Sequence, residues 1–180
     1  MAVPSQGTVA VGDKITASLW NSDVRDGVDF LLNPPACKVY KTANQSIADS
    51  AYACLTWNAE LFDTDTMHDN TTANSRVTFT TAGIYQVTLT CLWANNAVGF
   101  RYHTIEKNGT TTYNSGTNII EPFVIGALGA THAGANINFL STFNAGDYIQ
   151  VFVYQNSGGA LNLAGITDAH SSLSALWVSS

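Results

Sequence analysis

The stretch TAGIYQVTLTCLWANNAVGFRYHTIEKNGTTTYNSG, residues 81–116, decides the fold. In its first half, apolar residues alternate with polar ones, the apolar set being Tyr85, Val87, Leu89, Cys91 and Trp93. This period of two is typical of a strand with one buried and one wetter face. A second strand leads into Asn108-Gly109, a dipeptide typical of tight hairpins, and is expected to return through residues 110–114. The stretch holds no catalytic motif and predicts an all-β scaffold.

The rest of the chain after residue 36 repeats this pattern. Further strands are predicted at residues 37–42, 52–58, 75–81, 136–143, 148–155, 160–165 and 173–178. The tetrapeptide NAGD, residues 144–147, predicts a tight turn between two of them. About nine or ten short strands without strand–helix alternation predict a jelly-roll β-sandwich.

Residues 15–35 have a different period. Apolar side chains fall at helical spacing and form a stripe of Trp20, Val24, Val28 and Leu31. Thr16 or Ser18 is a suitable N-cap, and Pro34-Pro35 ends the helix. Gly27 costs about 1 kcal/mol relative to alanine, so this helix needs something to pack on. The helix either packs on the head of its own chain or docks onto a larger assembly, and the sequence leaves both alternatives open. We therefore divide the chain into an N-terminal arm and anchoring helix, residues 1–35, and a head, residues 36–180.

Composition excludes several classes of function. Charged residues make up only 11% of the 180 residues, and the formal net charge is −6. Seven scattered Lys and Arg residues form no basic patch, which argues against nucleic-acid binding. No apolar run approaches the roughly 18 residues of a membrane span. The N-terminus lacks a basic and an apolar region, so no secretory signal is expected and the protein is made in a cytoplasm.

The reactive side chains show no convincing site. Three cysteines, Cys37, Cys54 and Cys91, are an odd number without a CxxC pair, and we expect them to be small buried hydrophobes. The histidines have no metal-ligand spacing. The loop FDTDTMHD, residues 62–69, resembles the start of a calcium loop but lacks its glycine and distal glutamate. A solvated turn is the preferred interpretation, and a calcium ion shared between subunits is the alternative.

Enzyme motifs are also missing from the sequence. A glycosidase pair such as Glu106 with Asp147 is conceivable, but Asp147 has a ready role in the NAGD turn. We therefore predict no enzyme activity, no catalytic residues, no bound metal and no cofactor.

The order of motifs resembles a known family. The segments SRVTFTTAGIYQVTLTCLW, GFRYHTIEKNGT, FNAGDYIQVFVYQNSGGALNL and SALWV resemble the jelly-roll head of the complement-type, tumour-necrosis-factor-like superfamily, over about residues 36–180. The most specific matches are Gly83 with Tyr85, the Asn108-Gly109 turn and Gly146-Asp147. The chain has no collagen-like stalk, so complement or cytokine activity is not carried over.

The leader TVAVGDKITASLWNSDVRDGVDFLLNPPACKVYKT resembles segments that precede such heads in proteins of tailed bacteriophages, notably those of actinobacteria. This resemblance implies a virion structural protein that other virion proteins hold through residues 1–35. One alternative is a minor tail protein that attaches the particle to the host surface. The other is a capsid decoration protein anchored to the shell.

The family resemblance also implies a homotrimer. The candidates for its interface are Tyr102, Tyr148, Phe152, Tyr154, Leu176 and Trp177, although each of them can equally fill the core of one chain. Loops rich in Tyr, Asn and Thr are candidates for binding a cell-surface glycan, with Tyr113, Asn114, Asn118 and His170 as the contact residues.

Overall fold

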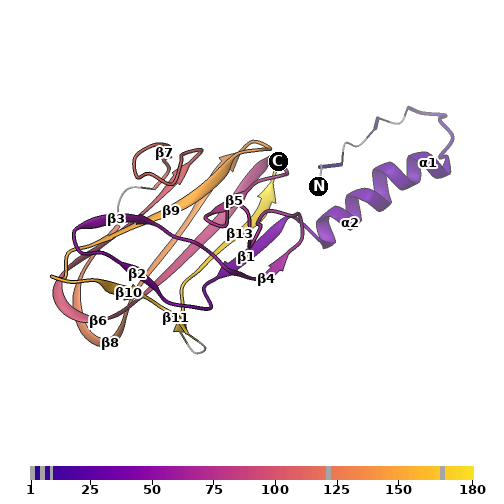
Figure 1. The fold of residues 1–180 in the computed structure, drawn as a ribbon. Helices are drawn as coiled ribbons and strands as arrows, with labels where there is room; N and C mark the ends of the chain where they lie inside the picture. The colour runs from indigo at the N-terminus through magenta and orange to yellow at the C-terminus, as the bar shows by residue number, and fades with distance from the viewer. Residues whose placement is uncertain (1–2, 5–6, 9, 121–122, 167–168) are drawn as a thin grey trace.

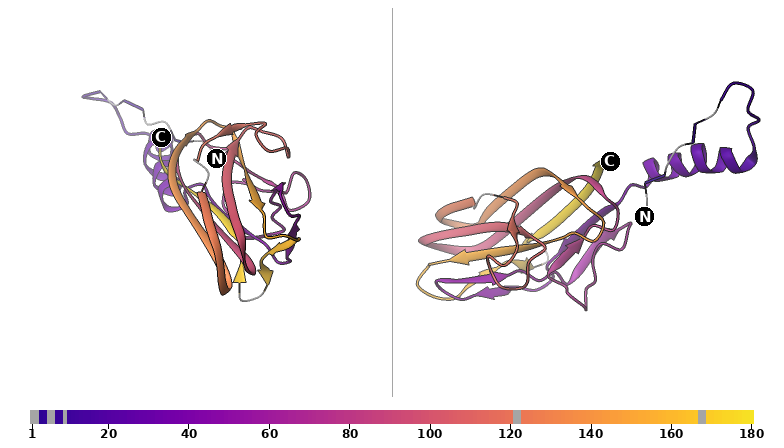
Figure 2. Two further views of the ribbon diagram at one scale, coloured as in Figure 1. Left: turned by 90° about the vertical axis from the view of Figure 1, so that its left-hand side faces the viewer. Right: turned by 90° about the horizontal axis from the view of Figure 1, so that it is seen from above.

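Two β layers stack into a sandwich in the computed structural model, and a helix projects from one end of the sandwich (Figure 1). The structure describes all residues except 1–2, 5–6, 9, 121–122 and 167–168, and the side chains of 123–133, 166 and 169 are also left undescribed. The fold is therefore the predicted jelly-roll sandwich with an N-terminal helix. The two views of Figure 2 show the layered head and the helix extending away from it.

The helical segment has three parts, α1 (Ala17–Trp20), a π-helical turn η1 (Asn21–Arg25) and α2 (Asp26–Leu32). Eleven strands form the main sheet: β1 (Ala36–Tyr40), β2 (Gln45–Ile47), β3 (Ala51–Cys54), β4 (Ala59–Asp63), β5 (Arg76–Thr78), β6 (Gly83–Lys107), β7 (Thr117–Asn118), β8 (Phe123–Phe143), β9 (Tyr148–Gln155), β10 (Leu161–Leu163) and β13 (Ser172–Ser179). The small hairpin of β11 (Gly165–Ile166) and β12 (Ala169–His170) stands apart.

The first layer, which we call the inner layer, has the order β4-β1-β13-β6-β8. Only the first half of β6 and the second half of β8 belong to it. Its register places Leu176 opposite Gln86 and Gln86 opposite Leu140, so these three side chains share one face. Tyr85, Val87 and Leu89 point the other way, into the core.

The second, outer layer is built on β9. This strand pairs with β3 and β5 on one side and with the second half of β6 on the other. The strand β9 begins at Tyr148, directly after the predicted NAGD turn, and Gly146 has φ 92° there. That turn and the β9 strand are confirmed.

The core lies between the layers. Its largest apolar side chains include Trp57, Trp93, Tyr85, Phe79 and Phe143, and Phe79 stacks on Phe143 with ring centroids 3.7 Å apart. The predicted alternation over residues 85–93 is confirmed, because Tyr85, Val87, Leu89, Cys91 and Trp93 are all buried.

Two local predictions were wrong. The Asn108-Gly109 pair does not form a two-residue hairpin, because β6 pairs with β7 through Lys107 and Thr117 and leaves a loop of residues 108–116 between them. The expected returning strand over 110–114 is part of this loop. The reason is tertiary: the Asn108 side chain bonds to the neighbouring turn at Asp147, and the loop folds back on the sheet.

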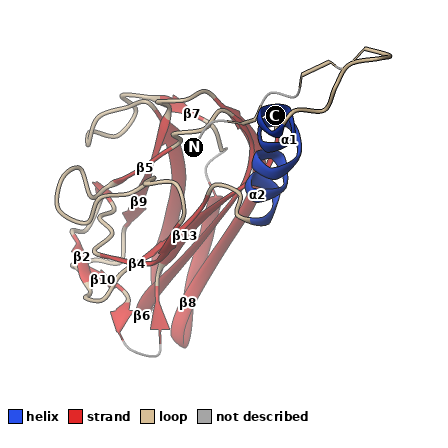
Figure 3. Ribbon diagram, turned by 90° about the vertical axis from the view of Figure 1, so that its right-hand side faces the viewer, coloured by secondary structure: helices blue, strands red, loops and turns tan. Residues whose placement is uncertain are grey.

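The N-terminal helix begins as predicted. Thr16 is the N-cap, and its hydroxyl accepts a hydrogen bond from the Leu19 N–H at 3.2 Å. The helix ends at Leu32, before the two prolines. Figure 1 shows the helix projecting from one end of the head, and Figure 3 shows the molecule from that end, with the helix toward the viewer.

Gly83, where β6 begins, is required by a close approach. Its φ is 152°, and a Cβ atom there would lie 2.2 Å from the indole nitrogen of Trp177. That indole donates a hydrogen bond to the Ala82 carbonyl at 3.2 Å. The Trp177 ring therefore lies against bare backbone at the end of the sandwich.

We expect Gly83→Ala to destabilise the head by at least about 3 kcal/mol, because the indole or the strand must move. The control is Gly146→Ala, which has a positive φ but no atom within 4 Å of the new Cβ. Strain alone predicts a loss of about 1 kcal/mol there. Urea unfolding measures both, and equal losses would contradict the steric explanation.

Candidate functional site

The predicted anchoring stripe is open to solvent. Trp20, Val24, Val28 and Leu31 are all exposed, and the last three line a shallow groove together with Gly27. Phe30 is instead the buried residue of α2, at 4% exposure. Its ring meets Trp177 edge-on, with centroids 4.8 Å apart and planes at 89°. Phe30 thus packs the helix onto the head, and the apolar stripe is exposed, with no partner among the residues that the structure describes.

The interface candidates do not form one surface. Tyr102, Tyr148, Phe152 and Tyr154 all lie on strands of the outer layer, whereas Leu176 and Trp177 belong to β13 of the inner layer. Phe152 is buried at 1% exposure, and Trp177 closes the end of the sandwich. Of the six candidates, only Leu176 has its side chain on the solvent-facing side of the inner layer and is exposed.

That side of the inner layer, which we call the open face, carries an apolar group that the sequence analysis largely missed. Its exposed members are Leu61, Phe62, Leu140 and Leu176. A groove runs beside them, lined by Ala36, Lys38, Leu61, Phe62, Gln86, Thr88, Ser174, Ala175 and Leu176. Exposed apolar groups gathered on one sheet face are typical of an interaction surface.

The loop of residues 108–116 is held down by a buried carboxylate. Glu106 is fully buried and accepts three backbone N–H bonds, from Asn114 at 2.6 Å, Ser115 at 3.2 Å and Gly116 at 3.0 Å. Charge-assisted bonds of this kind are stronger than neutral ones. The loop is consequently pinned against the outer layer.

The start of the loop is fixed by the neighbouring turn. Asp147 accepts from Asn108 Nδ2 at 2.6 Å and from the Asn144 N–H at 2.8 Å, and it pairs with Lys107 at 2.9 Å. Burial raises the pKa of Asp147, but the bonds from Asn108, Asn144 and Lys107 outweigh this and lower it. Asp147 is thus a turn residue as predicted, and neither it nor Glu106 is a free carboxylate.

Aromatic side chains gather where this loop meets the outer layer. The ring of Tyr113 lies parallel to that of Tyr52, with centroids 3.7 Å apart and planes at 2°. The Tyr113 and Tyr102 hydroxyl oxygens are 3.0 Å apart, and the ring centroids of Tyr154 and Tyr52 are 5.0 Å apart. We call Tyr52, Tyr102, Tyr113 and Tyr154 the tyrosine platform.

The ligand-loop candidates are divided by the fold. Tyr113, Asn114 and Asn118 lie in or beside the loop of residues 108–116, and Asn114 adopts φ 63°. His170 belongs to the β11–β12 hairpin, and its ring centroid lies 5.0 Å from that of Tyr40 in β1. Figure 1 shows β7 and β11 on opposite sides of the head. His170 therefore does not share a site with the other three.

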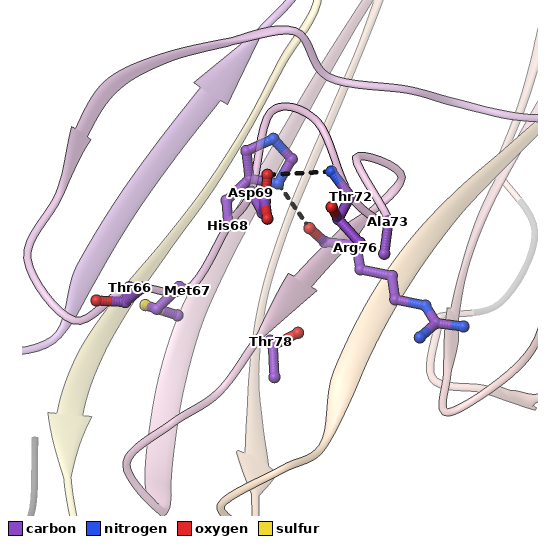
Figure 4. Close-up of a pocket in the computed structure, with 8 residues that line it drawn as sticks. All are labelled: Thr66, Met67, His68, Asp69, Thr72, Ala73, Arg76 and Thr78. Atoms are coloured by element: carbon purple, nitrogen blue, oxygen red, sulfur yellow. Dashed lines mark hydrogen bonds between the residues drawn. The ribbon is translucent and has the colours of Figure 1, made fainter.

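In the aspartate-rich loop, the carboxylates accept hydrogen bonds from backbone N–H groups of the same loop. Asp63 accepts N–H bonds from Asp65 and His68, and Asp69 accepts from Thr71 and Thr72. Those backbone bonds lower the pKa of Asp69 to about 2. Figure 4 shows Asp69 turned toward Thr72, and His68 toward the Arg76 carbonyl at 2.7 Å. The carboxylates of Asp63 and Asp69 thus cap the loop, although Asp65 and His68 are buried rather than solvated as the preferred interpretation expected.

Other chemistry is sparse in the part of the chain that the structure describes. Within it, no three His, Cys, Asp or Glu side chains gather closely enough for a metal ion. Cys37 and Cys91 are buried and Cys54 is half-buried, all three are unpaired, and burial raises their pKa values, that of Cys54 to about 11. None of the described helices is long and apolar enough to cross a membrane.

The fold has clear structural relatives. Murine APRIL matches with a TM-score of 0.58 at 13% identity, over 80% of this chain and 98% of its own. The globular domain of zebrafish complement 1qA protein matches with 0.54 at 12% identity, over 80% and 97%. The Eiger TNF of S. frugiperda matches with 0.59 at 9% identity, over 81% and 92%. The chain therefore has the TNF-like, C1q-like jelly-roll fold.

At the level of sequence, no protein-family model and no characterised protein matches the chain. Identities of 9–13% establish a shared fold and nothing further about activity.

We expect Glu106→Gln to loosen the loop of residues 108–116, because an amide NH₂ would replace one of the accepting oxygens. The predicted cost is about 1–3 kcal/mol, the range for an unsatisfied buried group. Amide hydrogen exchange at Asn114, Ser115 and Gly116 should become faster. The control is Glu60→Gln, because among the described residues the Glu60 side chain accepts a hydrogen bond from Asn70 alone, at an exposed position. Unchanged exchange in Glu106→Gln would show that the carboxylate does not hold the loop.

Proposed function

We propose that the protein is a virion structural protein of a tailed bacteriophage, displayed as a homotrimeric jelly-roll knob. The observation that carries the proposal is the pair of apolar surfaces that a single chain leaves uncovered. One is the open face of the inner layer, and the other is the stripe on the projecting helix. A head that associates through one and attaches through the other uses both.

The open face supports the homotrimer. Closed symmetry is the usual way for one chain to bury a surface of its own, and the family resemblance implies a threefold arrangement. Leu61, Phe62, Leu140 and Leu176 supply the apolar contacts. Three copies then expose their outer layers, with the tyrosine platform, to the surroundings.

The helix supports attachment. A segment of this length is marginally stable alone, and here it is joined to the head mainly through Phe30. Its open stripe, flanked by Asp23, suits an apolar groove on another virion protein. The proposed place is the tail, where the knob adheres to the host cell surface, and no catalytic step is part of this role.

The trimer is tested by light scattering of the full chain. We expect a mass of three chains, and Leu176→Asp should give a smaller species, because each interface would bury an unpaired charge. Leu31→Asp, an equivalent change on the helix stripe, should leave the trimer intact. A monomeric wild-type protein would refute the homotrimer, whereas dissociation by Leu31→Asp would move the interface to the helix.

The location is tested by electron microscopy of intact particles labelled with antibodies against the head. Label on the tail is expected. Label on the shell would instead favour a capsid decoration protein, the second placement that the leader allows. If particles carry no label and contain none of the chain, the virion proposal is wrong. Particles whose copy lacks residues 1–33 should lose the label in either location.

A further inference from the structure

We propose that the tyrosine platform is a binding site for a neutral polysaccharide chain. This inference deepens the proposed function, since it rests on an adhesive role for the head and names the surface and the class of ligand.

Strand register brings the platform together from distant parts of the sequence. Tyr52 of β3 lies opposite Tyr154 of β9, and Tyr154 lies opposite Tyr102 of β6. The three tyrosines therefore form a row across neighbouring strands on the side of the outer layer that faces away from the core. Phe100 extends this row, stacking on Tyr154 with centroids 5.7 Å apart.

The fourth tyrosine comes from the loop and is positioned before any ligand arrives. Tyr113 precedes the three residues whose N–H groups Glu106 holds, and its ring packs on Tyr52 and against Phe152. The Tyr148 hydroxyl also donates to the Gly109 carbonyl at 2.5 Å. A surface whose rings are already ordered loses little conformational entropy on binding.

The platform is not part of the monomer's main core. Its rings lie on the far side of the outer layer from Val151 and Val153, which are core residues. Tyr52 is 43% exposed and Phe100 36%, so the stack keeps ring surface in contact with water. Partly exposed aromatic rings gathered into one group are typical of an interaction surface.

The chemistry of these residues favours a neutral sugar over an anion. Every member of the platform is an uncharged aromatic residue, and burial raises the pKa of Tyr52, with a further increase from its bond to Tyr113. The platform residues themselves therefore offer no cation for a phosphate or carboxylate. A polysaccharide presents C–H faces that pack on aromatic rings, and hydroxyl groups that exchange hydrogen bonds with phenols.

The test is the binding of the full-length protein to an array of neutral and acidic bacterial polysaccharides, followed by NMR titration of the tyrosine rings with any oligosaccharide that binds. We expect neutral glycans to bind and to shift the platform tyrosines. Tyr52→Ala should weaken the affinity at least tenfold, and Tyr52→Phe should weaken it less, because the ring remains. The control is Tyr40→Ala on the inner layer, which should bind normally.

Three results would overturn the inference. They are the absence of binding to any neutral glycan, binding restricted to acidic glycans, and binding that Tyr52→Ala leaves unchanged. Thermal unfolding of each variant verifies that it is folded. If glycans fail to bind while particles carry the head on their tails, the binding site is refuted and the virion role is supported. If the protein binds glycans but is absent from particles, the binding site is supported and the virion role is refuted.

Discussion

The continuous backbone of β6 is the constraint on which the rest of the structure depends. Its 25 residues, Gly83–Lys107, pass from the inner to the outer layer and pair with β13, β8, β10, β9 and β7 in turn. Register shifts at residues 94–100 let the strand turn between the layers without ending. Because both layers share this ladder, neither can slide against the other.

Two of the proposed surfaces, the helix stripe and the tyrosine platform, depend on the two ends of that strand. At its start, Gly83 leaves space for Trp177, and Trp177 in turn receives Phe30 of the helix. Near its end, Glu106 holds the loop that delivers Tyr113 to the outer layer. The buried carboxylate of Glu106 accepts hydrogen bonds from backbone N–H groups instead of forming an ion pair. Its role is therefore to fix the conformation of the loop.

The sequence predicts the features that depend on local periodicity and turn chemistry. The alternation at residues 85–93, the NAGD turn and the Thr16 cap each specify their structure within a few residues. The short edge strands β2 and β4 were missed because their sequences, QSI and AELFD, show no regular alternation of apolar and polar residues. The predicted hairpin at Asn108-Gly109 was wrong because Glu106, which looks like an ordinary strand residue in the sequence, binds backbone N–H groups eight to ten residues further along the chain.

The candidate site shows the same division. Tyr113 is noticeable in the sequence because its loop is polar, whereas Tyr52 looks like an ordinary strand residue. Tyr102 and Tyr154 were predicted for the trimer interface and not for a ligand site. Only the pairing of β3, β9 and β6 places them in one row, and strand order is not written in any local pattern. Phe30 was similarly overlooked, because the wider stripe of Trp20, Val24, Val28 and Leu31 dominates the helical period although Phe30 makes the contact.

The way the helix joins the head has a mechanical consequence. Tension applied to the N-terminal segment enters the head through β1, which begins at Ala36 and is flanked by β13 and β4 in antiparallel pairing. Ladder hydrogen bonds run across the strands, so a pull along β1 loads them together in shear. Strands loaded this way resist force far better than strands peeled apart one bond at a time. A head pulled through its N-terminal segment is thereby expected to resist unfolding under tension.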